Sequence, residues 1–191
     1  MLSRMRLFTG LALPAHIIAP IETVMNQLRE IAPLRWSPLE NLHITTKFIG
    51  EWPEAQLPEL EDYLDKMPKP RPFTVTLARF GFLPNPHHPK IFFAAVHADA
   101  GLTKLAKNIE DTLATLGIKK ETHPYAPHVT LARVGQALSP AQALREKIAE
   151  LTKNGVNLEF GTFKATEFHL YQSKNSQYTP LATYPVAKET C

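Results

Sequence analysis

Apolar residues recur along the chain with two different periods, and the two kinds of run alternate. A spacing of three or four positions predicts amphipathic helices over 15–31, 53–67, 101–117 and 139–155. Shorter runs rich in β-branched and aromatic residues predict strands over 5–14, 42–50, 72–83, 90–98, 128–135, 161–173 and 178–186. Prolines fall mostly between these runs, and Gly50 is expected to end a strand and Gly117 a helix.

The order of these elements occurs twice. The first strands begin near 5 and near 90, and "HITTKFIG" (43–50) and "HVTLARVG" (128–135) lie 85 positions apart, each with β-branched residues at the second and seventh places. We interpret the chain, 1–191, as one domain made by internal duplication, with pseudo-symmetric lobes over about 5–83 and 90–173. The strand 178–186 has no clear place in this scheme, and one interpretation is that strands are exchanged between the lobes.

Each repeated strand begins with a histidine that is followed, two places later, by a threonine. Residues i and i+2 of a strand face the same side, so His43 shares a face with Thr45, and His128 shares one with Thr130. If the two copies pack about a pseudo-twofold axis, two imidazoles and two hydroxyls line one cleft from opposite sides.

Such a set of side chains suits a displacement at phosphorus. Imidazole titrates near pH 6.5, so one ring can act as general base while the other acts as general acid. Threonine hydroxyls can donate to the non-bridging oxygens and hold the phosphate between the rings. The scheme needs no metal ion and no cofactor. A 2′,3′-cyclic phosphate suits it, because the ester is strained and the leaving oxygen stays attached to the ribose.

Other polar and aromatic residues have two interpretations each. Lys47, four places after His43, would share the cleft face and add positive charge, or it is a solvated strand-end residue. Tyr125 would stack on a base beside the cleft, or pack under its own loop. Trp36 is expected to pack in the core or against its loop. His87 and His88 lie between prolines without a carboxylate or cysteine at ligand spacing, so we expect a solvated loop and no metal site.

Composition says little about the function, but it indicates the class of protein and the compartment in which it is expected. Hydrophobic residues make up 44% and charged residues 20%, which is ordinary for a globular protein with a core. The net charge of +3 is compatible with an anionic substrate, and there is no Lys/Arg block that would mark a basic arm. A single cysteine, Cys191, excludes an internal disulfide. With no secretory leader pattern and no run of 18 apolar residues, a cytoplasmic protein without membrane contact is expected.

With these motifs the sequence resembles the two-histidine phosphoesterase superfamily, which is defined by two H-x-[ST]-x motifs in a duplicated fold. Within it, "RLFTGLALP", "RWSPLENLHITTKFIGEW", "HPYAPHVTLARVG" and the late "LYQS…YTPLATYPV" resemble the bacterial and archaeal RNA 2′,3′-cyclic phosphodiesterases, formerly called 2′-5′ RNA ligases. The resemblance implies an α+β fold that is bilobal and internally duplicated, with two mostly antiparallel sheets and outer helices around a central cleft.

The resemblance also implies an activity and the residues for it. The enzyme would hydrolyse a terminal 2′,3′-cyclic phosphate of RNA to a 2′-phosphate, and the reverse 2′-5′ joining would use the same site. His43 would be the proton donor and His128 the proton acceptor, with Thr45 and Thr130 binding phosphate; the near-symmetric motifs do not themselves orient the two histidines. Arg133 matches a basic position often present after the second motif. On an ideal strand it would face away from His128, so its role requires a twist or a bulge.

The implied partner is RNA with a 2′,3′-cyclic phosphate end, tRNA fragments being one candidate, and a monomer is expected. Two alternatives stay open. One is a phosphodiesterase for small cyclic phosphates of nucleotides or ADP-ribose. The other is a non-catalytic RNA-end binding module that uses the cleft as a phosphate grip. Measurement of catalytic turnover distinguishes these alternatives from the RNA phosphodiesterase.

Overall fold

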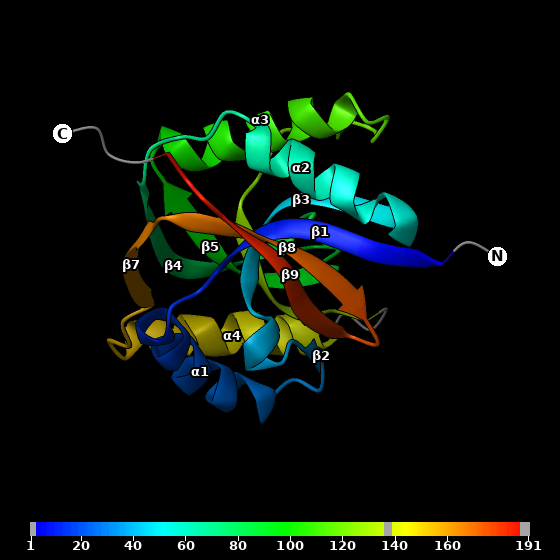
Figure 1. The fold of residues 1–191 in the computed structure, drawn as a ribbon. Coiled ribbons are helices and arrows are strands. Elements are labelled where there is room, and N and C mark those ends of the chain that lie inside the picture. Colours follow the sequence, from blue (N-terminus) through cyan, green and yellow to red (C-terminus); the bar gives the residue numbers. More distant parts are fainter. Residues whose placement is uncertain (1–2, 136–138, 188–191) are drawn as a thin grey trace.

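The computed structural model describes residues 3–135 and 139–187, and within these ranges the chain forms four α-helices, nine strands and two short 3-10 helices (Figure 1). In chain order the elements are β1 (Arg4–Ala12), α1 (Ala15–Arg29), β2 (Arg35–Trp36), η1 (Leu39–Asn41), β3 (His43–Pro53), η2 (Glu54–Gln56), α2 (Leu57–Lys66), β4 (Phe73–Leu83), β5 (Ile91–Ala98), α3 (Ala100–Ala114), β6 (His128–Arg133), α4 (Ser139–Lys153), β7 (Glu159–Ala165), β8 (Glu167–Lys174) and β9 (Gln177–Pro185).

All strands of the described chain belong to one sheet with the order β7-β4-β5-β6-β3-β1-β8-β9, and β2 pairs with β6. Every pairing is antiparallel. The sheet has two four-stranded halves, β7-β4-β5-β6 and β3-β1-β8-β9, and these meet through the pair Ile44 and Val129. The two antiparallel sheets expected from the resemblance are therefore the two halves of one sheet, in an α+β fold.

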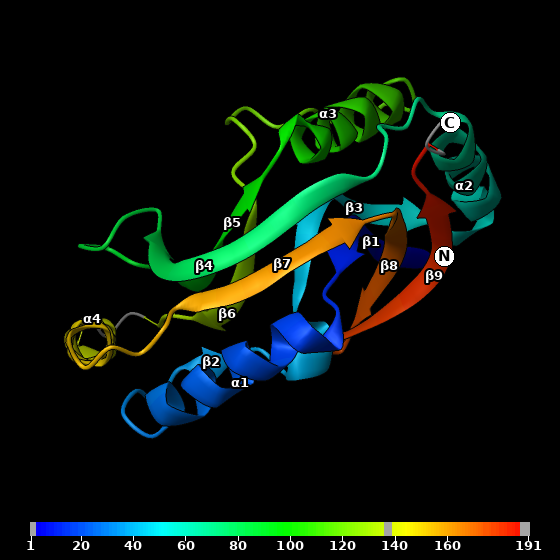
Figure 2. The same cartoon turned by 90° about the vertical axis from the view of Figure 1, so that its left-hand side faces the viewer.

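The helices cover the sheet from two sides. Figures 1 and 2 show α2 and α3 together on one side of the strands, and α1 and α4 on the other. The helical periodicity explains this packing, because each stripe of apolar residues becomes a buried face. In α1 the buried residues are Ile17, Ile21, Val24, Met25 and Leu28. In α3 they are Leu102, Leu105, Ala106, Ile109 and Leu113.

The halves of the chain and the halves of the sheet do not coincide. β4 belongs to the first half of the sequence, yet it pairs with β5 and β7. β8 belongs to the second half of the sequence, yet it pairs with β1, and β9 pairs with β8. Helix α1 follows the same pattern, since it packs against β7.

Two predicted strand boundaries are wrong. The run 161–173 is two strands, β7 and β8, which lie in opposite halves of the sheet and separate at Thr166; its carbonyl accepts the Val186 N–H at 2.9 Å. Gly50 does not end β3, which continues to Pro53. Leu7 pairs with Gly50 and Phe8 with Phe48, so an extra residue bulges out, and Gly50 supplies the positive φ of 84° next to it.

No helix in the described ranges is both long enough and apolar enough to cross a membrane. Cys191, the single cysteine of the sequence, lies outside the described residues.

Candidate active site

The two histidine strands lie side by side in the middle of the sheet. β3 and β6 are antiparallel, and Ile44 pairs with Val129. The register that this pair sets places His43 across from Thr130, and Thr45 across from His128. Residues directly opposite have Cβ atoms about 5 Å apart and diagonal neighbours about 7–8 Å apart. The four side chains thus form a rectangle with one imidazole at each end of a diagonal, a spacing into which one phosphate group fits.

A cavity of about 310 Å³ opens over this rectangle, and we call it the cleft. It contains both histidines, both threonines and Arg133, which are five of the seven predicted site residues. The rest of its lining comes from Arg6, Leu7, Phe8, Ser37, Asn41, Phe48, Gly50, Ile91, Ser173 and Tyr178.

Both imidazoles are held in the same way. Nδ1 of His43 donates to the carbonyl oxygen of Asn41 at 2.6 Å, and Nδ1 of His128 donates to that of Ala126 at 2.9 Å. A carbonyl can only accept, so each Nδ1 carries its proton and each Nε2 remains for the chemistry. Nε2 of His43 lies 2.9 Å from Oγ1 of Thr45, whose hydroxyl donates to it when the ring is neutral.

The two rings have different surroundings. His43 lies among three aromatic rings, with centroid distances of 4.7 Å to Phe8, 5.1 Å to Tyr178 and 6.1 Å to Tyr171. His128 has an edge contact with Phe93 at 5.5 Å. Burial lowers the pKa of His43; the hydrogen bond to the Asn41 carbonyl opposes this change, and the charge of His128 adds to it. His43 is therefore mainly neutral at pH 7 in the free protein.

Gly10 on β1 makes room for the His43 strand. A Cβ at this position would lie 2.8 Å from the carbonyl oxygen of Ile44 and 3.3 Å from Cδ2 of His43. The first distance is shorter than real contacts allow, so a larger residue would push β1 away from β3 and disturb the His43 ring.

A bulge brings Arg133 to the cleft. Phe93 pairs with Thr130 and Phe92 with Ala132, which leaves Leu131 as an extra residue in β6. The extra residue reverses the alternation of side chains, so Arg133 lines the cleft although it is five places after His128. This is the bulge that the sequence required for Arg133.

β3 has an equivalent bulge, and it overturns the expectation for Lys47. Gly10 pairs with Thr45 and Thr9 with Lys47, which leaves Thr46 as the extra residue. Lys47 is thereby turned away from the cleft, and its side chain is 2% exposed, so the alternative of a solvated residue is wrong as well. Its Nζ lies 2.9 Å from Oε1 of Glu110 and donates to the carbonyl of Lys119 at 2.8 Å. The residue that faces the cleft is the next one, Phe48, which is 58% exposed.

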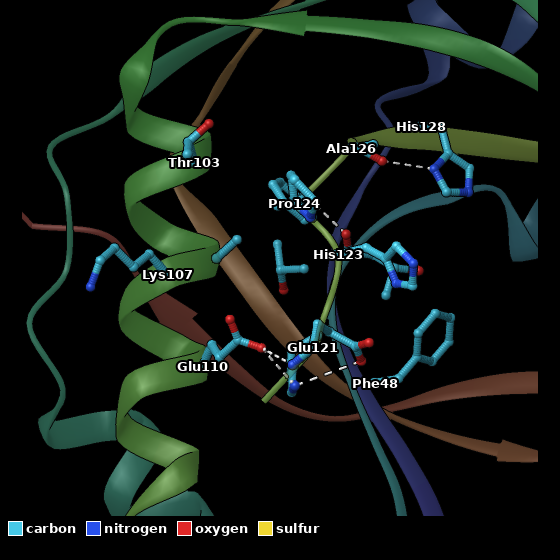
Figure 3. Close-up of a pocket in the computed structure, with 14 residues that line it drawn as sticks. Phe48, Thr103, Lys107, Glu110, Glu121, His123, Pro124, Ala126 and His128 are labelled. Atoms are coloured by element: carbon cyan, nitrogen blue, oxygen red, sulfur yellow. Dashed lines mark hydrogen bonds and ion pairs between the residues drawn. The ribbon is translucent and has the colours of Figure 1, made fainter. Parts of the chain in front are cut away.

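A second cavity of about 500 Å³, which we call the side pocket, adjoins the cleft at Thr45, Phe48 and His128. Figure 3 shows α3 on one side of it, and the segment that leads to His128 on the other. Tyr125 lines this pocket, but its hydroxyl donates to the backbone carbonyl of Thr45 at 2.9 Å and its ring packs against the core. Burial raises the pKa of this hydroxyl. These contacts support the packing interpretation of Tyr125 over stacking on a base.

The remaining predictions concern residues outside the cleft. Trp36 packs edge-on against Phe92 at 5.9 Å, and its Nε1 donates to the carbonyl of Ala32, which confirms core and loop packing. The N–H groups of His87 and His88 both donate to Oδ1 of Asn85 in an exposed loop. Among the described residues, no group of three or more histidine, cysteine or acidic side chains is arranged to hold a metal ion.

Sequence reasoning missed several residues of the cleft, notably Arg6, Ser37, Phe48 and Tyr178. Phe48 had a usable signal, because it occupies the same place in the first motif as Arg133 in the second. The others come from β1, from the loop before β3 and from β9, and pairing between distant segments brings them together. No local pattern marks them.

Comparisons with known proteins agree with this fold and identify the family. The chain is similar to the RNA 2′,3′-cyclic phosphodiesterase of Methanocaldococcus jannaschii, with 30% identity over 185 residues, 97% of this chain and 99% of that protein. It is 27% identical over 169 residues to the protein of the same name from Archaeoglobus fulgidus, across 88% of this chain and 91% of that one. The solved structure of a Thermus thermophilus protein superimposes with a TM-score of 0.76 at 25% identity, covering 97% of this chain and 100% of that one.

A family model described as the 2′-5′ RNA ligase superfamily matches residues 13–177, which include both histidine motifs. The chain therefore belongs to the 2′-5′ RNA ligase superfamily.

Proposed function

We propose that the protein hydrolyses 2′,3′-cyclic phosphate ends of RNA to 2′-phosphates, with His43 and His128 as the acid–base pair. The observation that carries the proposal is the arrangement of the two imidazoles in one cleft, each with Nδ1 bonded to the carbonyl two residues earlier and Nε2 left for chemistry. Relatives that match almost the whole chain are named for this activity, which supports the choice of substrate.

The reaction is one displacement at phosphorus. Nε2 of His128 takes a proton from a water molecule, whose oxygen forms a bond to phosphorus as the bond to the ribose O3′ breaks. His43, protonated at Nε2, gives its proton to O3′, and the product carries a 2′-phosphate and a free 3′-hydroxyl. Thr45 and Thr130 donate to the non-bridging oxygens, and Arg133 offsets their charge.

The donor role of His43 depends on the bound phosphate. In the free protein burial lowers the pKa of His43 and favours its neutral form. An anion beside the ring favours the charged form, so binding of the phosphodiester raises the pKa and supplies the proton to be donated. The carbonyl of Asn41 supports this state, because it accepts from Nδ1 whether or not Nε2 is protonated.

The same geometry supports 2′-5′ joining. If a 5′-hydroxyl replaces the water, it attacks phosphorus, O3′ leaves, and a 2′-5′ phosphodiester forms with the same proton transfers. The description of the family as 2′-5′ RNA ligases supports this reverse use of the site.

The first test is product analysis on an RNA oligomer that ends in a 2′,3′-cyclic phosphate, with EDTA present. We expect a 2′-phosphate product from the wild type and none from His43→Ala or His128→Ala. Hydrolysis retained in both variants would refute the paired-histidine mechanism. Binding without turnover in the wild type would favour the RNA-end binding module, and turnover of small cyclic phosphates alone would favour the rival phosphodiesterase.

A second test separates donor from acceptor. A p-nitrophenyl phosphodiester has a leaving group that needs no proton, so loss of the general acid is tolerated while loss of the general base is not. We expect His43→Ala to retain activity on this ester and His128→Ala to lose it. The opposite result would exchange the two roles.

We also propose that the protein works as a cytoplasmic monomer on RNA ends such as those of tRNA fragments. One chain supplies both histidines and both threonines, which supports a monomeric enzyme. Sedimentation of the purified protein and fractionation of cells test the two parts of this statement, and a dimer mass or a membrane fraction would contradict it.

A further inference from the structure

A third cavity, of about 470 Å³, continues outward from the cleft, and we call it the groove. It shares Arg6, Arg133 and Tyr178 with the cleft and extends to Arg35 on β2 and to the turn between β8 and β9. The two cavities therefore form one continuous surface, which leads from the two histidines and two threonines of the cleft to Arg35 and the β8–β9 turn.

The groove is positively charged and its charges are unpaired. Its lining contains the three arginines 6, 35 and 133 and no carboxylate. None of the three guanidinium groups makes a hydrogen bond or an ion pair with a described residue, although Glu51 lies opposite Arg6 on the neighbouring strand. Arg35 and Arg133 are direct cross-strand partners, an arrangement that destabilises a sheet when the charges are alike. An anion between them would remove this repulsion.

The groove is also preformed. Arg35 is placed by its neighbour Trp36, which is anchored on Phe92 and on the carbonyl of Ala32. On the opposite wall, Nδ2 of Asn41 donates to the carbonyl of Ser176 at 2.7 Å and ties the β8–β9 turn to the segment before β3. Little ordering is therefore needed when a ligand binds.

From these observations we infer that the groove binds the ribose-phosphate backbone of the RNA strand on the 5′ side of the cyclic phosphate. The inference rests on the proposed function. A 2′,3′-cyclic phosphate ends the strand, so the rest of the RNA can leave the cleft only on the 5′ side of that phosphate. The groove offers a path for it, because its unpaired arginines can each bind one of the successive backbone phosphates. The side pocket does not match them, because both of its lysines are already paired, Lys47 with Glu110 and Glu121 and Lys107 with Asp111.

The experiment compares two substrates that differ only in the upstream strand. A nucleoside 2′,3′-cyclic phosphate occupies the cleft alone, whereas an oligonucleotide with the same terminal base also occupies the groove. For the wild type we expect a higher kcat/KM on the oligonucleotide, with an advantage that falls as salt increases. The Arg35→Gln variant should lose about three- to fivefold on the oligonucleotide, with its log–log salt slope reduced by about 0.7–1, and should match the wild type on the mononucleotide.

Matched variants keep this result interpretable. Arg35→Lys retains the charge and should recover most of the oligonucleotide advantage, while Lys153→Gln removes one exposed charge from the end of α4 and should change neither substrate. An equal loss on both substrates, or no loss on the oligonucleotide, would overturn the inference. If the wild type opened neither cyclic phosphate, the proposed function would fail instead, so the two failures are distinguishable.

Discussion

Replacing Lys47 with methionine tests whether this lysine supports the fold or binds substrate. Methionine has a similar length and is unbranched, so the buried space stays filled while the charge is lost. In the structure Nζ of Lys47 bonds Glu110 and the carbonyl of Lys119, and it lies 3.7 Å from Glu121. The substitution therefore removes the link between β3, α3 and the segment after α3.

The size of the effect follows from the exposure of the partners. Removing one member of a fully buried ion pair costs about 3–5 kcal/mol, and removing one from an exposed pair costs about 1 kcal/mol or less. The Lys47 side chain is 2% exposed, but that of Glu110 is 25% exposed. In the variant, Oε1 of Glu110 would still accept a hydrogen bond from the N–H of Glu121, which is 2.7 Å long in the wild type. We expect a loss of about 2 kcal/mol in the free energy of unfolding, or about 4–8 °C in Tm for a chain of this size.

Thermal unfolding and steady-state kinetics on a cyclic phosphate are the assays. We expect Lys47→Met to melt earlier with kcat/KM close to that of the wild type, and Lys104→Met, on the exposed side of α3, to change neither quantity. An unchanged Tm together with a tenfold loss of kcat/KM would refute the reasoning and return Lys47 to the substrate site.

The pH dependence of this variant supplies an internal check. The N–H of Glu121 lowers the pKa of Glu110 against the opposing effect of burial, and Lys47 lowers it further. A carboxyl with a lowered pKa stabilises the fold above its ordinary pKa, and this contribution is lost as pH falls through the pKa of the folded state. The stability difference between wild type and Lys47→Met should therefore shrink as pH falls below about 4.5.

Three further predictions concern residues in or beside the cleft. Gly10→Ala should lower the free energy of unfolding by about 1–3 kcal/mol and should also lower kcat, because the added Cβ would collide with the Ile44 carbonyl beside His43. Thermal unfolding and steady-state kinetics measure the two effects, and full activity would contradict the prediction. Arg133→Gln should lose about tenfold or more in kcat/KM, since the Leu131 bulge brings its charge to the cleft, where we propose that the phosphate binds; wild-type kinetics would refute that role. Folding lowers the pKa of His43, so the unfolded chain binds more protons than the folded chain, and the free energy of unfolding should rise with pH up to about 6.5. Denaturant titrations at several pH values should show a smaller rise for His43→Asn.

The sequence predicts most of the elements, and it predicts that the four motif residues line one cleft, because helical periodicity and strand alternation are local. Prediction from the sequence fails where a bulged extra residue reverses which side chains of a strand face the cleft. "HITTKF" has a polar residue at every position from Thr45 to Lys47, so nothing in its pattern shows that Thr46 bulges and turns Lys47 inward. The same holds for the separation of β7 from β8, which depends on partners far away in the sequence.

The exchange of strands between the halves of the sheet also explains how so narrow a join can hold the two histidines in one cleft. In the described chain the halves are hydrogen-bonded to each other at one residue pair, and each half carries one of the two histidines. By itself, such a join would let the imidazoles drift apart. However, the chain crosses from one half of the sheet to the other twice, between β3 and β4 and again between β7 and β8, where Thr166 alone separates the two strands. These two crossings tether the halves of the sheet to each other and thereby limit how far His43 and His128 can move apart.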